Sequence, residues 1–302
     1  MSGTPSAARL AVDIGGTFTD VVLAVGGRQV TTKVLTTPAA PEDGVLTAIE
    51  KVMTVAGAAP PQVGLVVHGT TLATNALIER KGARTALVVT EGFRDSVEMA
   101  YENRFEQYDI GVDRPPPLVP RYLRWPVGER MNGQGEVLRP LDESMVEALL
   151  PAIEEHRIES IAVGFLHAYA NPVHERRVAE ILGDLATDIR VTLSSEVCPE
   201  IREYERQSTA CANAYVQPLM ARYLTLLDRR LRDLGFACPF YLMTSGGGLT
   251  TLETAVRFPI RLVESGPAGG AILAGRIAAD HGLDKVLSFD MGGTTAKVCL
   301  ID

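Results

Sequence analysis

The spacing of apolar and polar residues along the chain predicts a regular alternation of short strands and helices. In the first third, strand-type alternation gives way to helix-type spacing, and the glycine pairs Gly15-Gly16 and Gly26-Gly27 mark turns between strands. The elements predicted there are three strands within residues 9–35, a helix from Pro41 to about Ala56, a strand over Leu65–His68, a helix from Thr71 to about Lys81 and a strand over Thr85–Thr90. This order is typical of the α/β fold class.

Residues 91–140 break this regular pattern. They contain three consecutive prolines, Pro115 to Pro117, and further ones at Pro120, Pro126 and Pro140, among scattered arginine and tyrosine residues. Such a composition is typical of a long extended excursion. Two interpretations stay open, a segment that wraps against a partner or neighbouring domain and a plain surface loop.

The rest of the chain returns to alternating elements. They are a helix over Asp142–His156, a strand over Ile158–Phe165, a helix over Pro172–Leu185, a strand over Ile189–Leu193, a long helical stretch over Glu200–Leu234, a strand over Phe240–Thr244, a helix over Thr250–Val256, a helix over Ser265–His281 and strands over Val286–Phe289 and Ala296–Ile301. Pro218 removes a backbone hydrogen bond within the long stretch, so a kink and an interruption are expected there. The elements within about 90–195 predict a second, small α/β unit.

Length and composition are those of a globular protein with a sizeable core. The chain has 302 residues, of which 46% are hydrophobic and 22% charged. Its net charge of −8, without a basic stripe, argues against nucleic acid or an anionic membrane as a partner. The four cysteines are widely spaced and form no metal-binding pattern, which favours buried free thiols in a reducing cytosol. The sequence has neither a signal-peptide pattern nor an apolar run of membrane-helix length, so a cytoplasmic location is expected.

Two acidic glycine turns are the strongest chemical signal in the sequence. One is Asp13-Ile14-Gly15-Gly16-Thr17 and the other is Asp290-Met291-Gly292-Gly293-Thr294-Thr295, each between two short apolar strands. Glycine pairs permit positive φ angles and a close approach of the backbone to a ligand, while N–H groups and threonine hydroxyls can hold phosphate oxygens. An aspartate beside phosphates can hold Mg²⁺ or its waters. A single such turn is usually a structural hairpin, but two of them favour a nucleotide held between duplicated lobes.

Several further segments, spread along the chain, add to the signal of the two turns. They are Val12–Asp20, His68–Thr71 with Thr74–Ala76, Gly92–Asp95, Glu203–Arg206 with Ser208 and Thr209, Glu264–Gly270 and Phe289–Thr295. The two turns resemble the phosphate-1 and phosphate-2 loops of the actin, hexokinase and heat-shock-chaperone ATPase superfamily. Together with the other segments, they resemble the hydantoinase A, 5-oxoprolinase and acetone carboxylase β family over nearly the whole chain.

The resemblance implies a ribonuclease-H-like ATPase lobe with an inserted small α/β unit. Residues 1–90 would form an N-terminal half-lobe with the phosphate-1 loop, and residues 91–195 the proline-rich excursion and the small α/β unit. Residues 196–302 would form a helical segment, a connecting helix and the phosphate-2 hairpin. The chain stops one strand after the second turn, where the second lobe of such an ATPase only begins. The expectation is a truncated product or a subunit whose other half is a separate chain.

The resemblance also implies ATP and Mg²⁺ as cofactors. Asp13 and Asp290 would hold Mg²⁺ through waters and orient the γ-phosphate, although either alone is also explained as a turn-capping aspartate. The residues implied to bind the phosphates are Gly15, Gly16, Thr17, Gly292, Gly293, Thr294 and Thr295. Asp20 either belongs to this site or pairs with a nearby arginine.

Three further residues are candidate catalytic groups. Glu264 opens a small-residue helix that resembles the connecting helix of the superfamily; it either positions the attacking group or a metal-bound water, or is only a partner of the helix dipole. His68 and Asn75 lie where a strand runs into a helix, at the edge where α/β sheets bind ligands. The alternative for His68 is a satisfied core or capping residue. The Glu203–Arg206 segment is interpreted as a salt-linked helix face, with a site role as the alternative.

The implied function is that of an ATP-dependent cyclic-amide hydrolase subunit acting on hydantoins or 5-oxoproline. Phosphorylation of the amide oxygen would activate the ring, and a hydantoinase B-type subunit would be the partner. The same site in an acetone-type ketone carboxylase would phosphorylate an enol and bicarbonate. A non-enzymatic alternative is a truncated, inactive fragment, whose exposed last strand would favour self-association. The sequence contains no P-loop, zinc-protease or nucleophile-elbow motif that would favour another chemistry.

Overall fold

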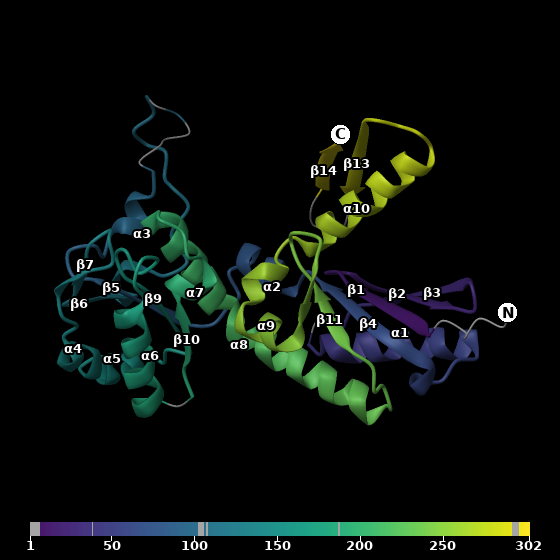
Figure 1. Ribbon diagram of the computed structural model, residues 1–302, viewed down its shortest axis with the longest axis horizontal. Coiled ribbons are helices and arrows are strands. Elements are labelled where there is room, and N and C mark those ends of the chain that lie inside the picture. Colours follow the sequence, from purple (N-terminus) through teal and green to yellow (C-terminus); the bar gives the residue numbers. More distant parts are fainter. Residues whose placement is uncertain (1–6, 38, 102–105, 107, 187, 292–295) are drawn as a thin grey trace. The chain divides into compact units, whose positions relative to one another are not determined.

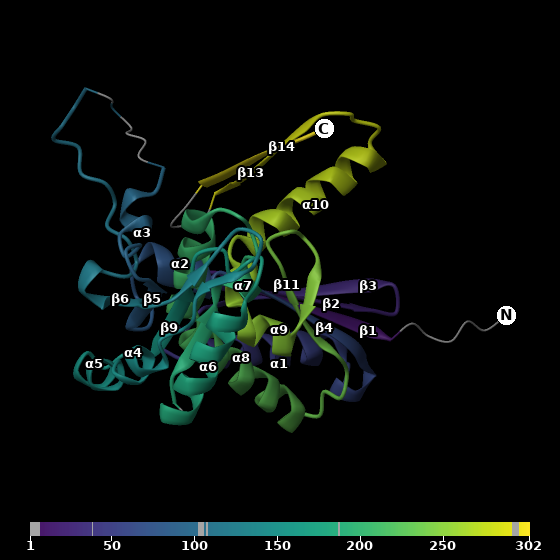
Figure 2. The ribbon, with the colours of Figure 1, turned by 60° about the vertical axis from the view of Figure 1, so that its left-hand side comes forward.

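The computed structural model describes all residues except 1–6, 38, 102–105, 107, 187 and 292–295. The chain divides into two compact units. Unit 1 combines Met1–Glu79 with Met220–Asp302, and unit 2 consists of Arg80–Leu219, so that unit 2 is inserted into the sequence of unit 1. Figures 1 and 2 show the elements of both units from two directions.

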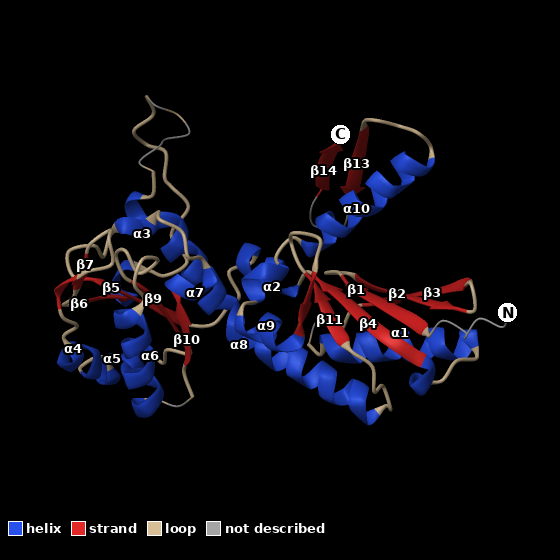
Figure 3. Cartoon of the chain, viewed as in Figure 1, coloured by secondary structure: helices blue, strands red, loops and turns tan. Residues whose placement is uncertain are grey.

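Unit 1 is built on a six-stranded mixed sheet with the order β12-β11-β4-β1-β2-β3 (Figure 3). Its strands are β1 (Ala8–Ile14), β2 (Phe18–Val25), β3 (Arg28–Leu35), β4 (Val63–Thr70), β11 (Phe240–Met243) and β12 (Leu249–Thr251). The first three form an antiparallel meander, while β4 runs parallel to β1 and β11 parallel to β4. The strict alternation of burial along β1 places Val12 in the core and Asp13 on the opposite, accessible face.

The helices of unit 1 are α1 (Pro41–Ala56), α2 (Leu72–Ile78), α9 (Leu252–Arg257) and α10 (Ser265–Asp280), with 3₁₀ helices η1 (Pro60–Gln62) and η3 (Pro259–Leu262). The α1 helix packs on β1, β2 and β3. It begins with a proline and two acidic residues, and ends at Gly57, whose φ of 64° is the left-handed conformation that glycine adopts without strain. The chain ends in an antiparallel hairpin of β13 (Val286–Met291) and β14 (Ala296–Ile301).

Unit 2 is built on a four-stranded parallel sheet with the order β10-β9-β5-β6. Its strands are β5 (Thr85–Thr90), β6 (Arg124–Val127), β9 (Ser160–Gly164) and β10 (Arg190–Leu193). The other elements are α3 (Ser96–Met99), η2 (Arg121–Leu123), β7 (Arg130–Met131), β8 (Val137–Arg139), α4 (Glu143–Glu147), α5 (Leu150–Glu155), α6 (Val173–Leu185) and α7 (Ser194–Val197). Every residue of β5 and β9 is buried, as expected of parallel strands covered on both faces.

The long helix α8 (Glu203–Asp233) contributes its first part to unit 2 and the rest to unit 1. The expected interruption near Pro218 is wrong, because the helix continues through the proline. The carbonyl oxygen of Tyr215, close to the proline, accepts a hydrogen bond of 2.8 Å from the N–H of Ala83. The carbonyl that lacks a helical donor because of Pro218 is that of Ala214, so the bond at Tyr215 is an additional tie between α8 and the segment before β5.

The predicted boundaries at residues 90 and 195 differ from those of the compact units. The sequence prediction places Thr85–Thr90 in the N-terminal half-lobe, but β5 pairs with β6 and β9 in unit 2. An apolar run indicates burial on both faces without specifying the neighbouring strands. Residues 91–140 also contain more than a loop, because β6 is a strand of this sheet. Pro126 fits there because β6 lies at the sheet edge.

The single helix expected over Asp142–His156 forms as two short helices, α4 and α5. Asp142 caps the first by accepting a hydrogen bond from the N–H of Met145, and Pro151 lies in the first turn of the second. Among the helices of the described ranges, none is both long and apolar enough to cross a bilayer.

Candidate functional site

A row of charged residues crosses the accessible face of the unit 1 sheet. The strand register aligns Asp13 on β1 with Gly69 on β4 and with Asp20 on β2, and it aligns Asp20 with Lys33 on β3. The ammonium of Lys33 lies 2.9 Å from the carboxylate of Asp20. Asp20 therefore has a basic partner, a lysine rather than the arginine considered from the sequence.

Gly69 makes room for the carboxylate of Asp13. A Cβ atom built on Gly69 would lie 2.9 Å from Asp13 Oδ1, closer than side-chain carbons normally approach an oxygen. The lack of a side chain at this position thus lets the Asp13 carboxylate extend over the neighbouring strand.

The electrostatic surroundings of Asp13 are dominated by other carboxylates. Although its side chain remains accessible to water, partial desolvation by the surrounding protein raises its pKa, and the negative charges of Asp20 and Asp290 raise it further. Lys297 and Lys33 act in the opposite direction. The two aspartates of the glycine turns, at opposite ends of the chain, are thus close enough to interact.

Glu264 and Lys297 join the α10 helix to the C-terminal hairpin. Lys297 pairs with Asp290 in the strand register, and its ammonium lies 3.3 Å from the carboxylate of Glu264. Glu264 has a φ of 64°, which is unusual for a residue with a side chain, and its N–H donates to the hydroxyl of Thr74 at 3.2 Å. Such a strained backbone conformation is typical of functional positions that their surroundings hold in place.

The first glycine turn is closed by backbone hydrogen bonds. The N–H of Gly15 donates to the carbonyl of Phe18 at 2.9 Å, and Thr36 holds the turn through its hydroxyl, which donates to the Gly15 carbonyl at 2.9 Å. Gly15 and Gly16 do not use the positive φ angles that a glycine pair permits; the left-handed pair is Gly26 and Gly27, in the next turn. Gly15 instead serves close packing, since an added Cβ would lie 3.2 Å from the Phe18 carbonyl oxygen.

Asn75 acts on this turn through Thr71. The backbone N–H and the hydroxyl of Thr71 both donate to the carbonyl of Ile14, at 3.0 and 3.1 Å. The Asn75 amide donates in turn to the Thr71 hydroxyl at 3.4 Å. The start of α2 is thereby fixed against the end of β1, where the first glycine turn begins.

His68 lies on the opposite face of the sheet, in the core. Its Nδ1 is 3.3 Å from the Val12 carbonyl and its Nε2 is 2.8 Å from the Tyr223 hydroxyl, so both ring nitrogens are occupied. Burial lowers the pKa of the imidazole to about 4, which keeps it neutral. These contacts describe a packed core residue with no ring nitrogen left to contact a substrate.

Comparison with known families covers nearly the whole chain. Residues 9–185 match the hydantoinase/oxoprolinase N-terminal region, and residues 206–302 match the hydantoinase/oxoprolinase domain. The chain belongs to the hydantoinase/oxoprolinase family.

Two curated relatives illustrate the range of this family. Caprolactamase subunit alpha from Pseudomonas jessenii is 34% identical over 97% of this chain and 43% of its own length. The 5-oxoprolinase of Saccharomyces cerevisiae is 31% identical over 96% of this chain and 25% of its own length. This hydantoinase/oxoprolinase chain thus spans less than half the length of either relative.

Solved structures of the family show the same fold. The crystal structure of the ATP-dependent caprolactamase from Pseudomonas jessenii matches with a TM-score of 0.86 at 33% identity. A nucleotide-free structure of acetone carboxylase, from work on ATP-dependent acetone carboxylation, matches with a TM-score of 0.87 at 27% identity. Each match covers 97% of this chain and 43% of the other. The mixed α/β architecture is therefore that of the N-terminal part of these enzymes.

The second predicted phosphate-binding turn, Gly292, Gly293, Thr294 and Thr295, lies outside the described residues. Within the described residues, no three His, Cys, Asp or Glu side chains gather into a metal-binding group. A divalent cation in this part of the chain would therefore have Asp13 and Asp290 as its protein ligands. Waters or phosphate oxygens would fill the remaining coordination positions.

Sequence reasoning missed Lys297, Lys33 and Gly69. The two lysines could have been found from the hairpins. Counting equal numbers of residues outward from each turn places Lys297 opposite Asp290 and Lys33 opposite Asp20. Gly69 appeared only as part of a family segment. Its role depends on the parallel pairing of β1 with β4, which joins residues distant in the sequence.

Proposed function

We propose that this chain forms the ATP- and Mg²⁺-binding part of an enzyme that acts on cyclic amides. The observation that carries the proposal is the accessible carboxylate of Asp13, for which Gly69 leaves room. The negative charges of Asp20 and Asp290 contribute to the raised pKa of this carboxyl. Carboxylates that repel each other on an accessible surface favour a bound cation, because the cation relieves the repulsion. Their position beside a glycine turn fits a cation that accompanies phosphate groups.

The donor set suits magnesium. Carboxylate oxygens are the protein ligands that Mg²⁺ prefers, and Mg²⁺ usually keeps several waters and binds through one or two carboxylates. Asp13 and Asp290 provide that number. When bound, Mg²⁺ would neutralise charge on the nucleotide phosphates.

The residues of the chain divide the remaining tasks. We assign phosphate binding to the backbone of Gly15 and Gly16 and to the hydroxyl of Thr17, and the orientation of the attacking group to Glu264. Lys297, beside Glu264 and opposite Asp290, supplies a positive charge for a phosphate oxygen. In the proposed step the amide oxygen of the ring attacks the γ-phosphorus, the bond from that phosphorus to ADP breaks, and the amide N–H loses its proton to solvent.

The relatives support a cyclic amide as the acceptor. The names caprolactamase and 5-oxoprolinase both denote enzymes that act on cyclic amides, and the first is ATP-dependent. Caprolactamase subunit alpha also belongs, by name, to a multi-subunit enzyme. We therefore propose a second subunit of the hydantoinase B type as the partner, with ring opening as its task.

A second candidate function is ATP-dependent carboxylation of a ketone. The observation in its favour is the structural match to acetone carboxylase. Its TM-score is 0.87, and that of the caprolactamase match is 0.86. In that case the same phosphate site would activate an enol and bicarbonate. Bicarbonate-dependent phosphate release distinguishes the two functions.

The test is Mg²⁺-dependent phosphate release from ATP by the chain, alone and with the protein that co-purifies with it. Hydantoin, 5-oxoproline, and acetone with bicarbonate are the substrates to compare. We expect release to depend on a cyclic amide, and Asp13→Asn to lower its rate by about 100-fold or more, because it removes a charge from the phosphate site. Asp184→Asn, an exposed carboxylate on α6, is the matched control and should leave the rate unchanged.

Two results would contradict the proposal. Substrate-dependent release that persists at full rate in Asp13→Asn would mean that the acidic row does not serve the phosphates. No release from the folded chain with any substrate, alone or with its partner, would favour the inactive fragment.

A further inference from the structure

Unit 2 contains a pocket that the nucleotide site does not use. It has a volume of about 600 Å³ and lies where the strands of the parallel sheet end. Segments after three strands contribute to it, with Phe93 after β5, Arg130 after β6 and His167 after β9. The first turn of α8 adds Glu203 and Tyr204.

The sheet topology favours ligand binding at this place. Strands β5 and β9 are neighbours, but the chain continues from β5 to β6 on one side and from β9 to β10 on the other (Figure 1). The loops that follow β5 and β9 therefore diverge and leave a crevice between them. Open α/β sheets bind their ligands at such a switch point, beyond the carboxyl ends of the strands.

Two segments that the nucleotide site leaves unexplained meet in this pocket. The segment Gly92–Asp95 supplies Gly92, Phe93 and Asp95, and the segment Glu203–Arg206 supplies its first three residues. Both carry the resemblance to the family, although they are more than 100 residues apart in the sequence. A shared pocket accounts for both.

The pocket wall includes two strained backbone positions. Ala100 has a φ of 51° and His167 a φ of 55°, both in the region that side-chain-bearing residues seldom occupy. The Nδ1 atom of His167 is buried, and no described residue forms a hydrogen bond with it. Conformations of this kind persist where the surrounding structure fixes them, and they gather at ligand sites.

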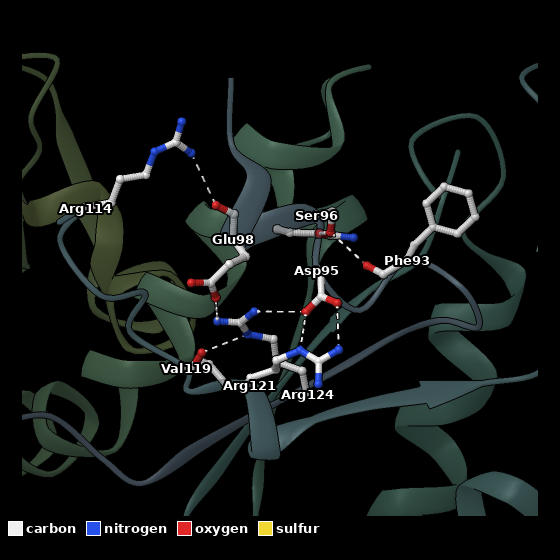
Figure 4. Close-up of polar contacts among 9 residues, drawn as sticks. Phe93, Asp95, Ser96, Glu98, Arg114, Val119, Arg121 and Arg124 are labelled. Carbon is white, nitrogen blue, oxygen red and sulfur yellow. Dashed lines mark hydrogen bonds and ion pairs between the residues drawn. The ribbon is translucent and has the colours of Figure 1, made fainter. Parts of the chain in front are cut away.

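The carboxylate of Asp95 is already neutralised. Arg121 binds it with two parallel hydrogen bonds of 2.8 and 2.9 Å, and the buried Arg124 lies 3.7 Å away while donating to Glu98 (Figure 4). The hydrogen bond from Arg121 is the main cause that holds the pKa of Asp95 below its usual value. Asp95 is therefore a fixed structural anion and leaves no charge for a ligand.

Arg130 is in the opposite situation. Its half-buried guanidinium lies over the ring of Phe93, 4.8 Å from the ring centre, and no carboxylate among the described residues pairs with it. The contact with the ring restrains the side chain, and the planar fork of N–H groups of a guanidinium matches the two oxygens of a carboxylate. Glu203, likewise without a basic partner in the described parts of the chain, provides an acceptor for an N–H group.

We propose that this pocket binds a small molecule that carries both a carboxylate and an N–H group, with Arg130 as the residue that binds the carboxylate. The apolar part of the ligand would contact Phe93, Met99 and Leu166, which line the same pocket. The site stands on the geometry of unit 2 alone. Only the choice of a cyclic amide as the probe rests on the proposed function.

The experiment compares two probes that differ in the carboxylate alone, 5-oxoproline and 2-pyrrolidinone. Their binding to the full chain is measured by isothermal titration calorimetry without nucleotide. We expect 5-oxoproline to bind about 10- to 100-fold more tightly, the range of one charged hydrogen-bonded contact. Arg130→Met should remove this difference, and Arg130→Lys, which keeps the charge without the fork, should restore part of it.

Arg190→Met is the matched control, because Arg190 is exposed and begins β10 at the opposite, amino end of the same sheet. It should leave both affinities unchanged. Equal binding of the two probes, no binding of either, or a preference for 5-oxoproline that survives in folded Arg130→Met would each overturn the proposal. Because nucleotide is absent, failure of the ATP site alone would leave these affinities as they are.

Discussion

At the scale of single residues, the site depends on which side of a strand each residue faces. His68 and Gly69 are adjacent in β4, yet the first is enclosed in the core and the second lies beneath the Asp13 carboxylate. Sequence reasoning assigned both to one ligand-binding segment. The face of each residue depends on the register of β4 against β1, and that register is set by long-range packing.

The buried imidazole of His68 should make the stability of the chain depend on pH. Its pKa is about 4 in the folded state and near 6.5 when unfolded, so between these values the unfolded state binds a proton that the folded state does not. Its contribution to stability is complete above about pH 6.5 and is lost as the pH falls towards 4. From pH 7.5 to 5 we expect the wild type to lose about 2 kcal/mol more unfolding free energy than His68→Gln.

Urea unfolding followed by circular dichroism at the two pH values measures this difference. His281→Gln, at an exposed histidine, is the control and should show the pH dependence of the wild type. An equal pH dependence in the wild type and His68→Gln would mean that His68 titrates normally and is not enclosed as described.

At the scale of elements, most helices and strands were predictable, whereas their partners were not. The predicted strand Thr85–Thr90 matches β5 residue for residue, and the predicted helix Pro41–Ala56 matches α1. The assignment of β5 to unit 2 was missed, because its apolar run has no feature that distinguishes one sheet from another. The helix caps and prolines carry local information, while strand pairing depends on contacts between distant residues.

Glu175 shows how the elements of unit 2 are joined at the carboxyl end of the sheet. Its buried carboxylate accepts hydrogen bonds from the N–H of Phe165 after β9, from the Ser194 hydroxyl, and from the N–H and hydroxyl of Ser195 in α7. Burial raises the pKa of this carboxyl, and the four donors oppose that effect. The network fixes α6 and α7 against the end of the sheet, next to the segment that enters the pocket.

Removal of this carboxylate should therefore destabilise unit 2. We expect Glu175→Ala to lower the free energy of unfolding by about 3 kcal/mol, since it leaves buried donors without an acceptor. Fluorescence of Trp125, the only tryptophan and a residue of β6, reports urea unfolding of this unit. Glu180→Ala on the same helix removes a largely exposed ion pair with Arg177 and should cost at most about 0.5 kcal/mol. Equal effects of the two variants would refute the structural role of Glu175.

At the scale of the whole molecule, the C-terminal hairpin exposes an apolar face. Leu287 pairs with Leu300 and Phe289 with Val298 across the two strands, and these side chains are 59–73% exposed. Exposed apolar strands of this kind favour association with another chain. The self-association expected from the sequence remains a prediction, now placed on one face of the hairpin.

We expect the apparent mass of the chain in light scattering to rise with concentration. The double variant Phe289→Thr, Leu300→Thr keeps strand-forming residues and should remain monomeric over the same range. Leu185→Thr, which replaces a partly exposed leucine at the end of α6, is the control and should behave as the wild type. A wild type that stays monomeric at all concentrations would contradict this prediction.

The central claim is that the row around Asp13 binds Mg²⁺ and nucleotide, and calorimetric binding of Mg·ATP to the chain tests it most directly. We expect binding by the wild type, and a loss of about tenfold or more in affinity in Gly69→Ala, because a methyl group there displaces the Asp13 carboxylate. Gly183→Ala, in the exposed part of α6 with open space around it, should bind as the wild type does. Absence of binding by the wild type, or equal affinities of the wild type and Gly69→Ala, would contradict the account.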